Sequence, residues 1–195
     1  MMSDELKQTA PIVAFETQRA FEDWLRKKHA NVPALWVRFF KKGSGKKTII
    51  YGEALDVALC YGWIDSQVKK YDEESYIQKF TPRGAKSIWS KRNTEHAGRL
   101  IQEKRMKPSG LIQIQAAQKD GRWDRAYHSP KNMSVPASFL TELKKHKKAF
   151  IFFKTLHKAN VYAIAWRLQT AVKPETYAKR QTAIVQMLTE GKRFH

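Results

Sequence analysis

The chain has 195 residues, of which 42% are hydrophobic. It contains 37 Lys and Arg and 18 Asp and Glu side chains, which gives a formal net charge of +19. This length and apolar content allow a buried core, in one domain or in one domain with a small appendage. The single cysteine, Cys60, excludes an intrachain disulfide. The positive charge predicts attraction to phosphate-rich or other anionic partners; the alternative is that it serves only solubility.

The chain is expected to be cytoplasmic. One cysteine within an apolar run is typical of a small core residue in a reducing compartment. Residues 1–9 are polar and contain acids, so no secretory signal is expected there. No apolar stretch approaches the length of a membrane span, and membrane insertion is therefore not expected.

The first two thirds of the chain mix predicted helices and strands. Apolar residues at helical spacing predict a helix over residues 18–29, and the aromatic and β-branched run at 35–40 predicts a strand. A second helix is expected over residues 54–62, with Gly62 as its C-terminal stop. Two more strands follow at 64–71 and 75–81, in which Ile64, Ser66 and Val68 oppose Asp65, Gln67 and Lys69. Helices are then expected over 90–104 and 108–121.

The last third is predicted to be helical. Pro136 opens this region, and Pro174 is placed to begin its final helix. The predicted class is α+β, with a small antiparallel sheet of about three strands covered by helices, followed by a helical C-terminal subdomain. We predict an α+β domain over residues 1–130 and a helical module over 131–195 that packs on it.

The positive charge is concentrated in the predicted helical module. Residues 131–195 contain 13 basic and 3 acidic side chains, a net charge of +10 over 65 residues. Such runs are often solvated helix faces, and a phosphate-binding surface is the alternative. The densest cluster, and the predicted basic surface, is Lys144, Lys145, Lys147 and Lys148.

Common catalytic and cofactor signatures are absent from the sequence. The segment GSGKKT at 43–48 has the wrong glycine spacing for a phosphate loop, so a loop between two elements is favoured. The six histidines form no paired metal motif and Cys60 stands alone, so no metal site is predicted. The sequence accordingly predicts no catalytic residue, no metal and no cofactor.

Residues 61–93 combine aromatic rings, one acid and several cations. If Gly62 ends the preceding helix, Trp63 and Asp65 project near the helix end. There Asp65 could act as a general base or accept a hydrogen bond from a substrate group. The alternative is that Asp65 caps a turn or forms a structural ion pair with Arg83.

The part of this region around residue 90 is a candidate anion-binding site. Cations surround the predicted helix start at Ser90, and a helix N-terminus with free N–H groups beside cations attracts negative charge. The alternative is that Trp89 belongs to the core and the cations are solvated. The candidate ligand-binding residues are Trp63, Asp65, Arg83, Lys86, Trp89, Ser90 and Asn93.

At these residues the chain resembles the YdeI/OmpD-associated family of bacteriocin-protection proteins. The resemblance extends over residues 15–191 and rests on EALDVALCYGWID at 53–65, FTPR at 80–83, SIWS at 87–90, Asn93, DGRW at 120–123 and AY at 126–127 before SP at 129–130. In the C-terminal part it rests on VP at 135–136, FF at 152–153, KPET at 173–176 and KR at 179–180. His128 and Tyr177 depart from the family pattern, which has an acid and an Arg there. The resemblance implies tolerance to bacteriocins or other envelope stress, and it implies no reaction or cofactor.

Two functions from different classes are predicted. The first is a non-enzymatic stress- or bacteriocin-protection protein whose basic surface binds an anionic partner, either nucleic acid or an acidic protein. The second is an enzyme or small-anion binder with a cleft around Trp63, Asp65, Arg83 and Trp89, in which the Arg holds an anion and the rings stack on it. The oligomeric state is left open.

Overall fold

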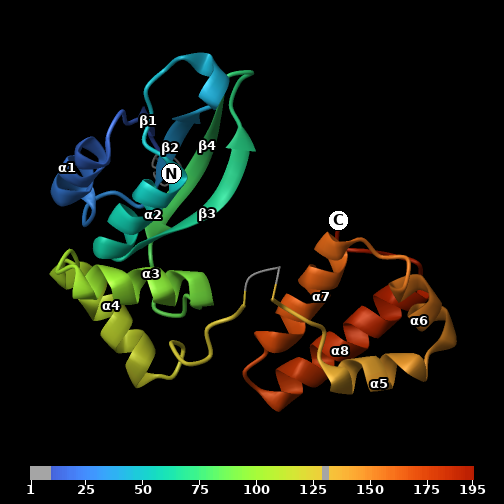
Figure 1. The fold of residues 1–195 in the computed structure, drawn as a ribbon. Helices are drawn as coiled ribbons and strands as arrows, with labels where there is room; N and C mark the ends of the chain where they lie inside the picture. Colours follow the sequence, from blue (N-terminus) through green and yellow to red (C-terminus); the bar gives the residue numbers. More distant parts are fainter. Residues whose placement is uncertain (1–9, 129–131) are drawn as a thin grey trace, which may run out of the picture. The chain divides into compact units, whose positions relative to one another are not determined.

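The computed structural model describes residues 10–128 and 132–195. These residues form two compact units (Figure 1). Of the described residues, the N-terminal unit comprises 10–88 and Asn93–Asp124, and the C-terminal unit comprises Trp89–Arg92, 125–128 and 132–195. The domain boundary expected after residue 130 stays a prediction, because residues 129–131 lie outside the described ranges.

The N-terminal unit contains a four-stranded sheet. Its strands are β1 (Ile12–Ala14), β2 (Leu35–Phe40), β3 (Trp63–Lys70) and β4 (Ser75–Pro82), in the order β1-β2-β4-β3. Strands β2, β4 and β3 are antiparallel neighbours, whereas β1 runs parallel to β2. The α+β class is confirmed, but the expectation of three antiparallel strands is wrong. The missed strand, β1, has three residues, which is too short for alternation to reveal it.

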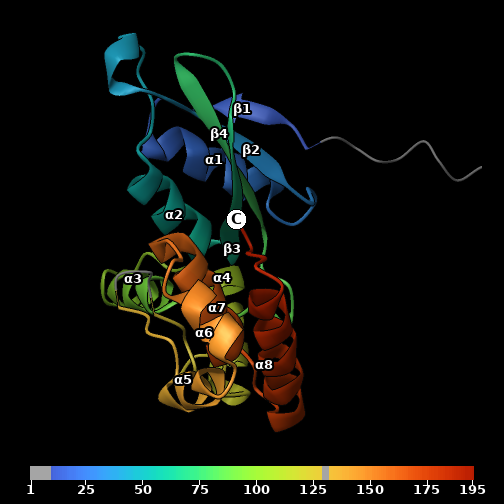
Figure 2. The same ribbon diagram turned by 90° about the vertical axis from the view of Figure 1, so that its right-hand side faces the viewer.

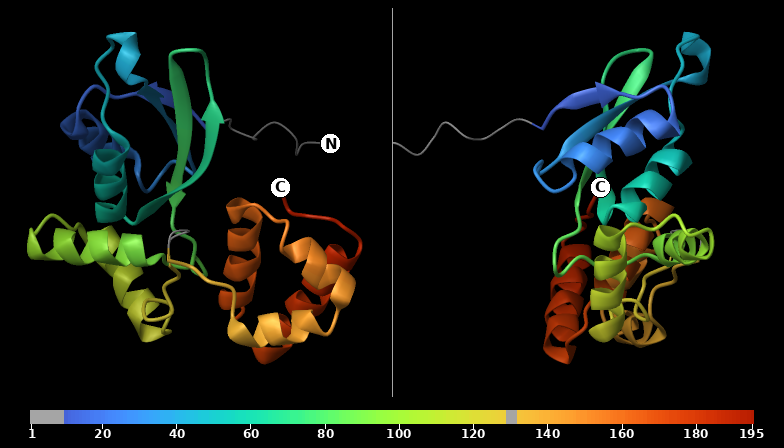
Figure 3. Two further views of the ribbon diagram at one scale, coloured as in Figure 1. Left: turned by 45° about the vertical axis from the view of Figure 1, so that its right-hand side comes forward. Right: turned by 90° about the vertical axis from the view of Figure 1, so that its left-hand side faces the viewer.

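Helices α1 (Gln18–Lys28) and α2 (Tyr51–Cys60) cover one face of the sheet (Figures 1 and 3). Phe21 of α1 meets Phe80 of β4 edge-on, with 5.8 Å between the ring centroids. The hydroxyl of Tyr51 in α2 donates a hydrogen bond to Asp65 of β3. Burial alternates along β2, and its buried residues lie on this helix-covered face. The apolar surface removed from water between the two layers stabilises the unit.

Two further helices attach to α2. Gly62 ends α2 as predicted, with a φ of +74°, and α4 (Pro108–Lys119) then packs closely on the last turn of α2. The backbone N–H of Lys107 donates to the carbonyl of Cys60 at 3.1 Å. Helix α3 (Lys91–Gln102) contacts α2 through His96 and Arg99, which both bond to a carboxylate of α2.

A β-bulge in β3 reverses the expected facing of its second half. Asp65 pairs with Phe80, but Val68 already pairs with Gln78 and Lys69 with Ile77, so the register shifts between Asp65 and Val68. The extra residue moves each later side chain to the opposite face of the sheet. Asp65 and Lys69 therefore lie on opposite faces, and the strict alternation expected from the sequence is wrong beyond Asp65.

The C-terminal unit is built from α5 (Ala137–Lys144), α6 (Lys147–Phe153), α7 (Lys158–Gln169) and α8 (Pro174–Thr189). Figure 3 shows these helices packed around a common interior. Their shared core includes Phe139, Leu143, Ala149, Ile164, Leu168, Ile184 and Leu188. Pro174 opens α8 as expected, since its missing N–H costs nothing in a first helical turn. Within the described ranges, no helix combines the length and apolarity needed to span a membrane.

Candidate nucleic-acid interface

The second face of the sheet, turned away from α1 and α2, carries aromatic rings and cations from three strands. In β2, Leu35, Val37 and Phe39 are buried on the helix-covered side, so the alternate residues Trp36, Arg38 and Phe40 lie on the other side. The antiparallel register puts Lys79 of β4 opposite Trp36. We call this surface the outer sheet face and define it by six residues: Trp36, Arg38, Phe40, Lys69, Tyr71 and Lys79.

Two lysines lie over the ring of Trp36. The Nζ atom of Lys69 lies 5.1 Å from the centroid of the indole ring, and the Nζ atom of Lys79 lies 5.9 Å from it. These are cation–π distances. Within the described residues, neither lysine has a carboxylate within ion-pair distance. Two positive charges that have no counter-ion among residues 10–128 and 132–195 therefore lie close to a partly exposed indole.

A second group on the outer sheet face is centred on Arg38. Its guanidinium carbon lies 4.5 Å from the ring centroids of both Phe40 and Tyr71. Its nitrogens donate to Ser75 Oγ at 3.0 Å and to Asp72 Oδ2 at 2.6 Å. These bonds hold the guanidinium of Arg38 beside the rings of Phe40 and Tyr71.

Asp72 is held ionised in this group. The hydrogen bond from Ser75 lowers the pKa of Asp72 below its ordinary value, and the backbone N–H of Glu74 and the charge of Arg38 act in the same direction. Asp72 thereby offsets the charge of Arg38. The cations that remain available to an anion on this face are Lys69 and Lys79.

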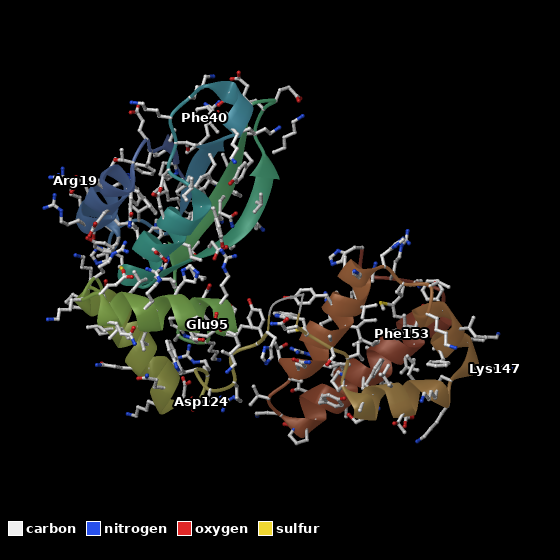
Figure 4. The ribbon with its side chains drawn as sticks, viewed as in Figure 1. Arg19, Phe40, Glu95, Asp124, Lys147 and Phe153 are labelled. Atoms are coloured by element: carbon white, nitrogen blue, oxygen red, sulfur yellow. The ribbon has the colours of Figure 1, made fainter. Side chains whose placement is uncertain are left out.

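The 41–48 loop borders this surface. It starts with the short 3-10 helix η1 (Lys42–Ser44) and contains Gly45 at a φ of +68°. Lys46 in this loop bonds to Glu74 at 2.5 Å and lies 5.2 Å from the ring centroid of Phe40. Figure 4 labels Phe40 at the end of β2, next to the loop. The loop thus connects two elements, as predicted.

The predicted cleft residues of the N-terminal unit lie in packed surroundings. Trp63 is only 1% exposed, and its indole N–H donates to the carbonyl of His29. Asp65 accepts hydrogen bonds from Tyr51 at 2.9 Å and from Gln78 at 3.3 Å. Both donors belong to the helix-covered side, so Asp65 joins α2 to the sheet.

Arg83 and its neighbours follow β4. Arg83 is 6% exposed and donates from Nη1 to the carbonyl of Ile88 at 3.3 Å. Lys86 is exposed, and Asn93 is buried in the first turn of α3. Trp89 and Ser90 belong to the C-terminal unit, where Trp89 is 2% exposed and Ser90 forms a bridge with Tyr127. A joint ligand site of these residues stays a prediction.

The predicted basic surface lies at the junction of α5 and α6. All four lysines are exposed: Lys144, Lys145, Lys147 and Lys148. Lys145 bonds to Glu142 at 2.7 Å. Figure 4 labels Lys147, the first residue of α6. The C-terminal unit as a whole has 16 basic and 3 acidic residues, a net charge of +13.

The most connected ion pairs of the N-terminal unit are structural. Asp56 of α2 bonds to Nδ1 of His96 at 2.7 Å and to Arg99 at 2.5 Å. Burial raises the pKa of Asp56, but the bonds and charges of His96 and Arg99 outweigh burial, and the pKa lies below its usual value. Among the described residues, no group of three His, Cys, Asp or Glu side chains is placed to hold a metal ion.

The residues of the outer sheet face were not singled out from the sequence. Strand alternation at 35–40 already places Trp36, Arg38 and Phe40 on one face, so this signal was present. Lys79 requires knowledge of the strand pairing, and Lys69 requires the bulge, which reverses its facing. Neither is visible in a single sequence.

Two known families match the chain. Residues 13–113, which include the whole outer sheet face, match a domain of unknown function (DUF8412). Residues 132–191, which contain α5 to α8, match the family described as bacteriocin-protection, YdeI or OmpD-associated. Comparison with curated proteins and with solved structures found no match. The chain therefore belongs to the DUF8412 family, whose model covers more than half of it, and its C-terminal helices match the YdeI/OmpD-associated bacteriocin-protection family.

Proposed function

We propose that the protein is a non-enzymatic binder of single-stranded nucleic acid and that the outer sheet face is its binding surface. The observation that carries this proposal is the indole of Trp36 with the Nζ atoms of Lys69 and Lys79 over its ring, because these two lysines have no acidic partner among the described residues. Bases stack on aromatic rings and phosphates pair with cations, so alternating rings and lysines suit a strand whose bases are exposed.

The chemistry of this face favours single strands over duplexes. A duplex hides the flat sides of its bases, and a sheet surface that offers rings gains little from it. An unpaired strand can lay one base on Trp36 and a base further along on Phe40 or Tyr71. The Nζ atoms of the two lysines lie over the indole, so a base that stacks there displaces them, and their flexible stems let them turn toward phosphates of the same strand.

The C-terminal unit supports the same function through its charge. A net charge of +13 attracts any polyanion and raises the local concentration of nucleic acid around the protein. The four lysines at the α5–α6 junction supply contacts that do not depend on sequence. Binding without turnover also agrees with the protective role that the bacteriocin-protection family description suggests.

The proposal is tested with a fluorescently labelled single-stranded DNA oligonucleotide, its duplex form and the full-length protein. Binding is measured by fluorescence anisotropy across a salt series. Trp36→Ala should weaken single-strand binding about 5- to 150-fold, because one stacked base contributes about 1–3 kcal/mol. Its salt slope should stay unchanged, since no charge is removed. Trp36→Phe, which keeps a ring, should recover part of the affinity.

A charge-matched pair of variants completes the test. Lys69→Gln with Lys79→Gln should make the salt slope shallower by about 1 to 1.5, since each single-strand phosphate contact contributes about 0.7. Lys27→Gln with Lys28→Gln removes two charges from α1, on the covered side of the sheet, and should leave affinity almost unchanged. Equal effects of the two double variants, or no binding at low salt, would refute the proposed surface.

A further inference from the structure

A groove on the C-terminal unit has the composition of a small-molecule site. It lies between α7 and α8, which run side by side in Figure 2, and its volume is about 350 Å³. Its walls come from Trp166, Ile184, Met187 and Phe194, and two arginines, Arg167 and Arg180, lie among these apolar side chains. This volume is at the lower end of the range for ligand pockets.

The two arginines are anchored by hydrogen bonds to uncharged oxygen atoms and have no acidic partner among the described residues. Arg180 donates from Nη1 to the backbone carbonyl of Arg167 at 2.6 Å and to Thr170 Oγ1 at 3.2 Å. Arg167 donates from Nη1 to the carbonyl of Ala163 at 3.1 Å. Within the described part of the chain, neither guanidinium has a carboxylate within 4 Å. Each keeps Nη2 and Nε for another acceptor.

The aromatic wall of the groove is held in place. Asn160, 3% exposed, accepts hydrogen bonds at Oδ1 from the backbone N–H groups of Phe194 and His195, at 3.0 and 3.1 Å. This fastens the C-terminal segment and places the Phe194 ring 3.7 Å from the guanidinium carbon of Arg167. A ring stacked on a guanidinium fixes its plane and restricts its nitrogens to a few directions.

We propose that this groove binds a small molecule that joins a carboxylate or phosphate to a flat apolar body. Anchored guanidiniums bind either anion with paired, charge-assisted hydrogen bonds. The low polarity of the walls strengthens these bonds, because fewer water molecules compete for the charges. Trp166 and Phe194 offer their rings to the flat part of the ligand. This site is separate from the proposed nucleic-acid surface and takes a different class of ligand.

The test uses isothermal titration calorimetry of the full-length protein with four probes. 2-Naphthoate and 1-naphthyl phosphate combine an anion with a flat body and distinguish a carboxylate ligand from a phosphate ligand. 1-Naphthol carries the body without the anion, and inorganic phosphate carries the anion without the body. We expect one of the first two probes to bind at least 10-fold more tightly than both incomplete probes.

Matched variants locate the binding. Arg167→Gln with Arg180→Gln should weaken binding of the preferred probe about 10- to 100-fold, because charge-assisted hydrogen bonds are lost. Lys179→Gln removes a neighbouring exposed charge of α8 and should leave the affinity within twofold. Where the double variant loses its helical circular dichroism, Phe194→Ala replaces it and should also weaken binding. Any of three results would overturn the proposal: binding that is unchanged in the folded arginine variant, binding of 1-naphthol as tight as that of the anionic probes, or no binding of either anionic probe at about 1 mM.

Discussion

Replacement of Gly110 by alanine adds one methyl group and is expected to lower the free energy of unfolding of the N-terminal unit by more than a surface substitution of this size would. Gly110 lies in the first turn of α4, where that helix crosses the end of α2. A Cβ atom at this position would lie 2.3 Å from the carbonyl oxygen of Cys60 and 2.8 Å from that of Leu59. Ordinary contact starts at 3.4 Å, so the helices would have to separate by about 1 Å at this point.

The expected magnitude follows from the identity of the contacting atoms. Overpacking costs about 1–3 kcal/mol, and the upper end applies because both oxygens belong to backbone that cannot rotate away. The higher helix propensity of alanine returns about 1 kcal/mol. The net loss in the free energy of unfolding is therefore about 2 kcal/mol, which corresponds to a Tm lower by about 4–8 °C.

The assay is thermal and urea unfolding followed by circular dichroism, with hydrogen exchange to assign the loss to the N-terminal unit. Gly98 in α3 is the matched control, since an added Cβ there meets no atom within 4 Å. Gly98→Ala should raise the unfolding free energy by about 0.5–1 kcal/mol. If Gly110→Ala were as stable as the wild type, the close approach of α4 to α2 would be disproved.

Three further predictions concern other charged or reactive groups. Asp56→Asn should lower the unfolding free energy by about 1–3 kcal/mol, because a side chain only 13% exposed loses charged bonds to His96 and Arg99. The pKa of Asp56 in the folded state is lowered, so its contribution to the free energy of unfolding is present above about pH 4 and is lost as the pH falls through the folded-state pKa. The urea midpoints of the wild type and the variant should therefore converge in acid. Burial raises the pKa of Cys60 to about 11, so its thiol should react with a disulfide reagent at pH 8 far more slowly in the native protein than in guanidinium, and equal rates would contradict its burial. Neutralising the four α5–α6 junction lysines should make the salt slope of oligonucleotide binding shallower by about 2 to 3, and an unchanged slope would remove them from the contact surface.

Local signals determined most of the helices and the longer strands. The helix at Gln18–Lys28 and the strand at Leu35–Phe40 follow from spacing and residue type alone. Gly62 ends α2 as expected, because a φ of +74° is readily adopted only by glycine. In such segments, neighbouring residues along the chain determine the conformation.

The sequence pattern of the predicted ligand-binding residues does not by itself say which of them are buried. Trp63, Asp65 and Arg83 are close in sequence, yet the structure buries Trp63 and Arg83 and engages Asp65 with Tyr51 and Gln78. Aromatic and charged residues that are buried have the same sequence pattern as residues in a ligand cleft. Burial, which separates the two cases, is a property of the folded chain.

By itself the sequence determined the composition, the excess of positive charge, the α+β class and the exposed lysines of the helical C-terminal part. Tertiary structure alone decided which distant side chains meet. Lys69 lies beside Trp36 because of the bulge in β3, and Lys79 does so because of the pairing of β4 with β2. The groove around Arg167 and Arg180 is likewise formed by α7, α8 and the C-terminal segment whose backbone is hydrogen-bonded to Asn160. These surfaces arise from long-range packing, which depends on the whole core and has no local sequence signal.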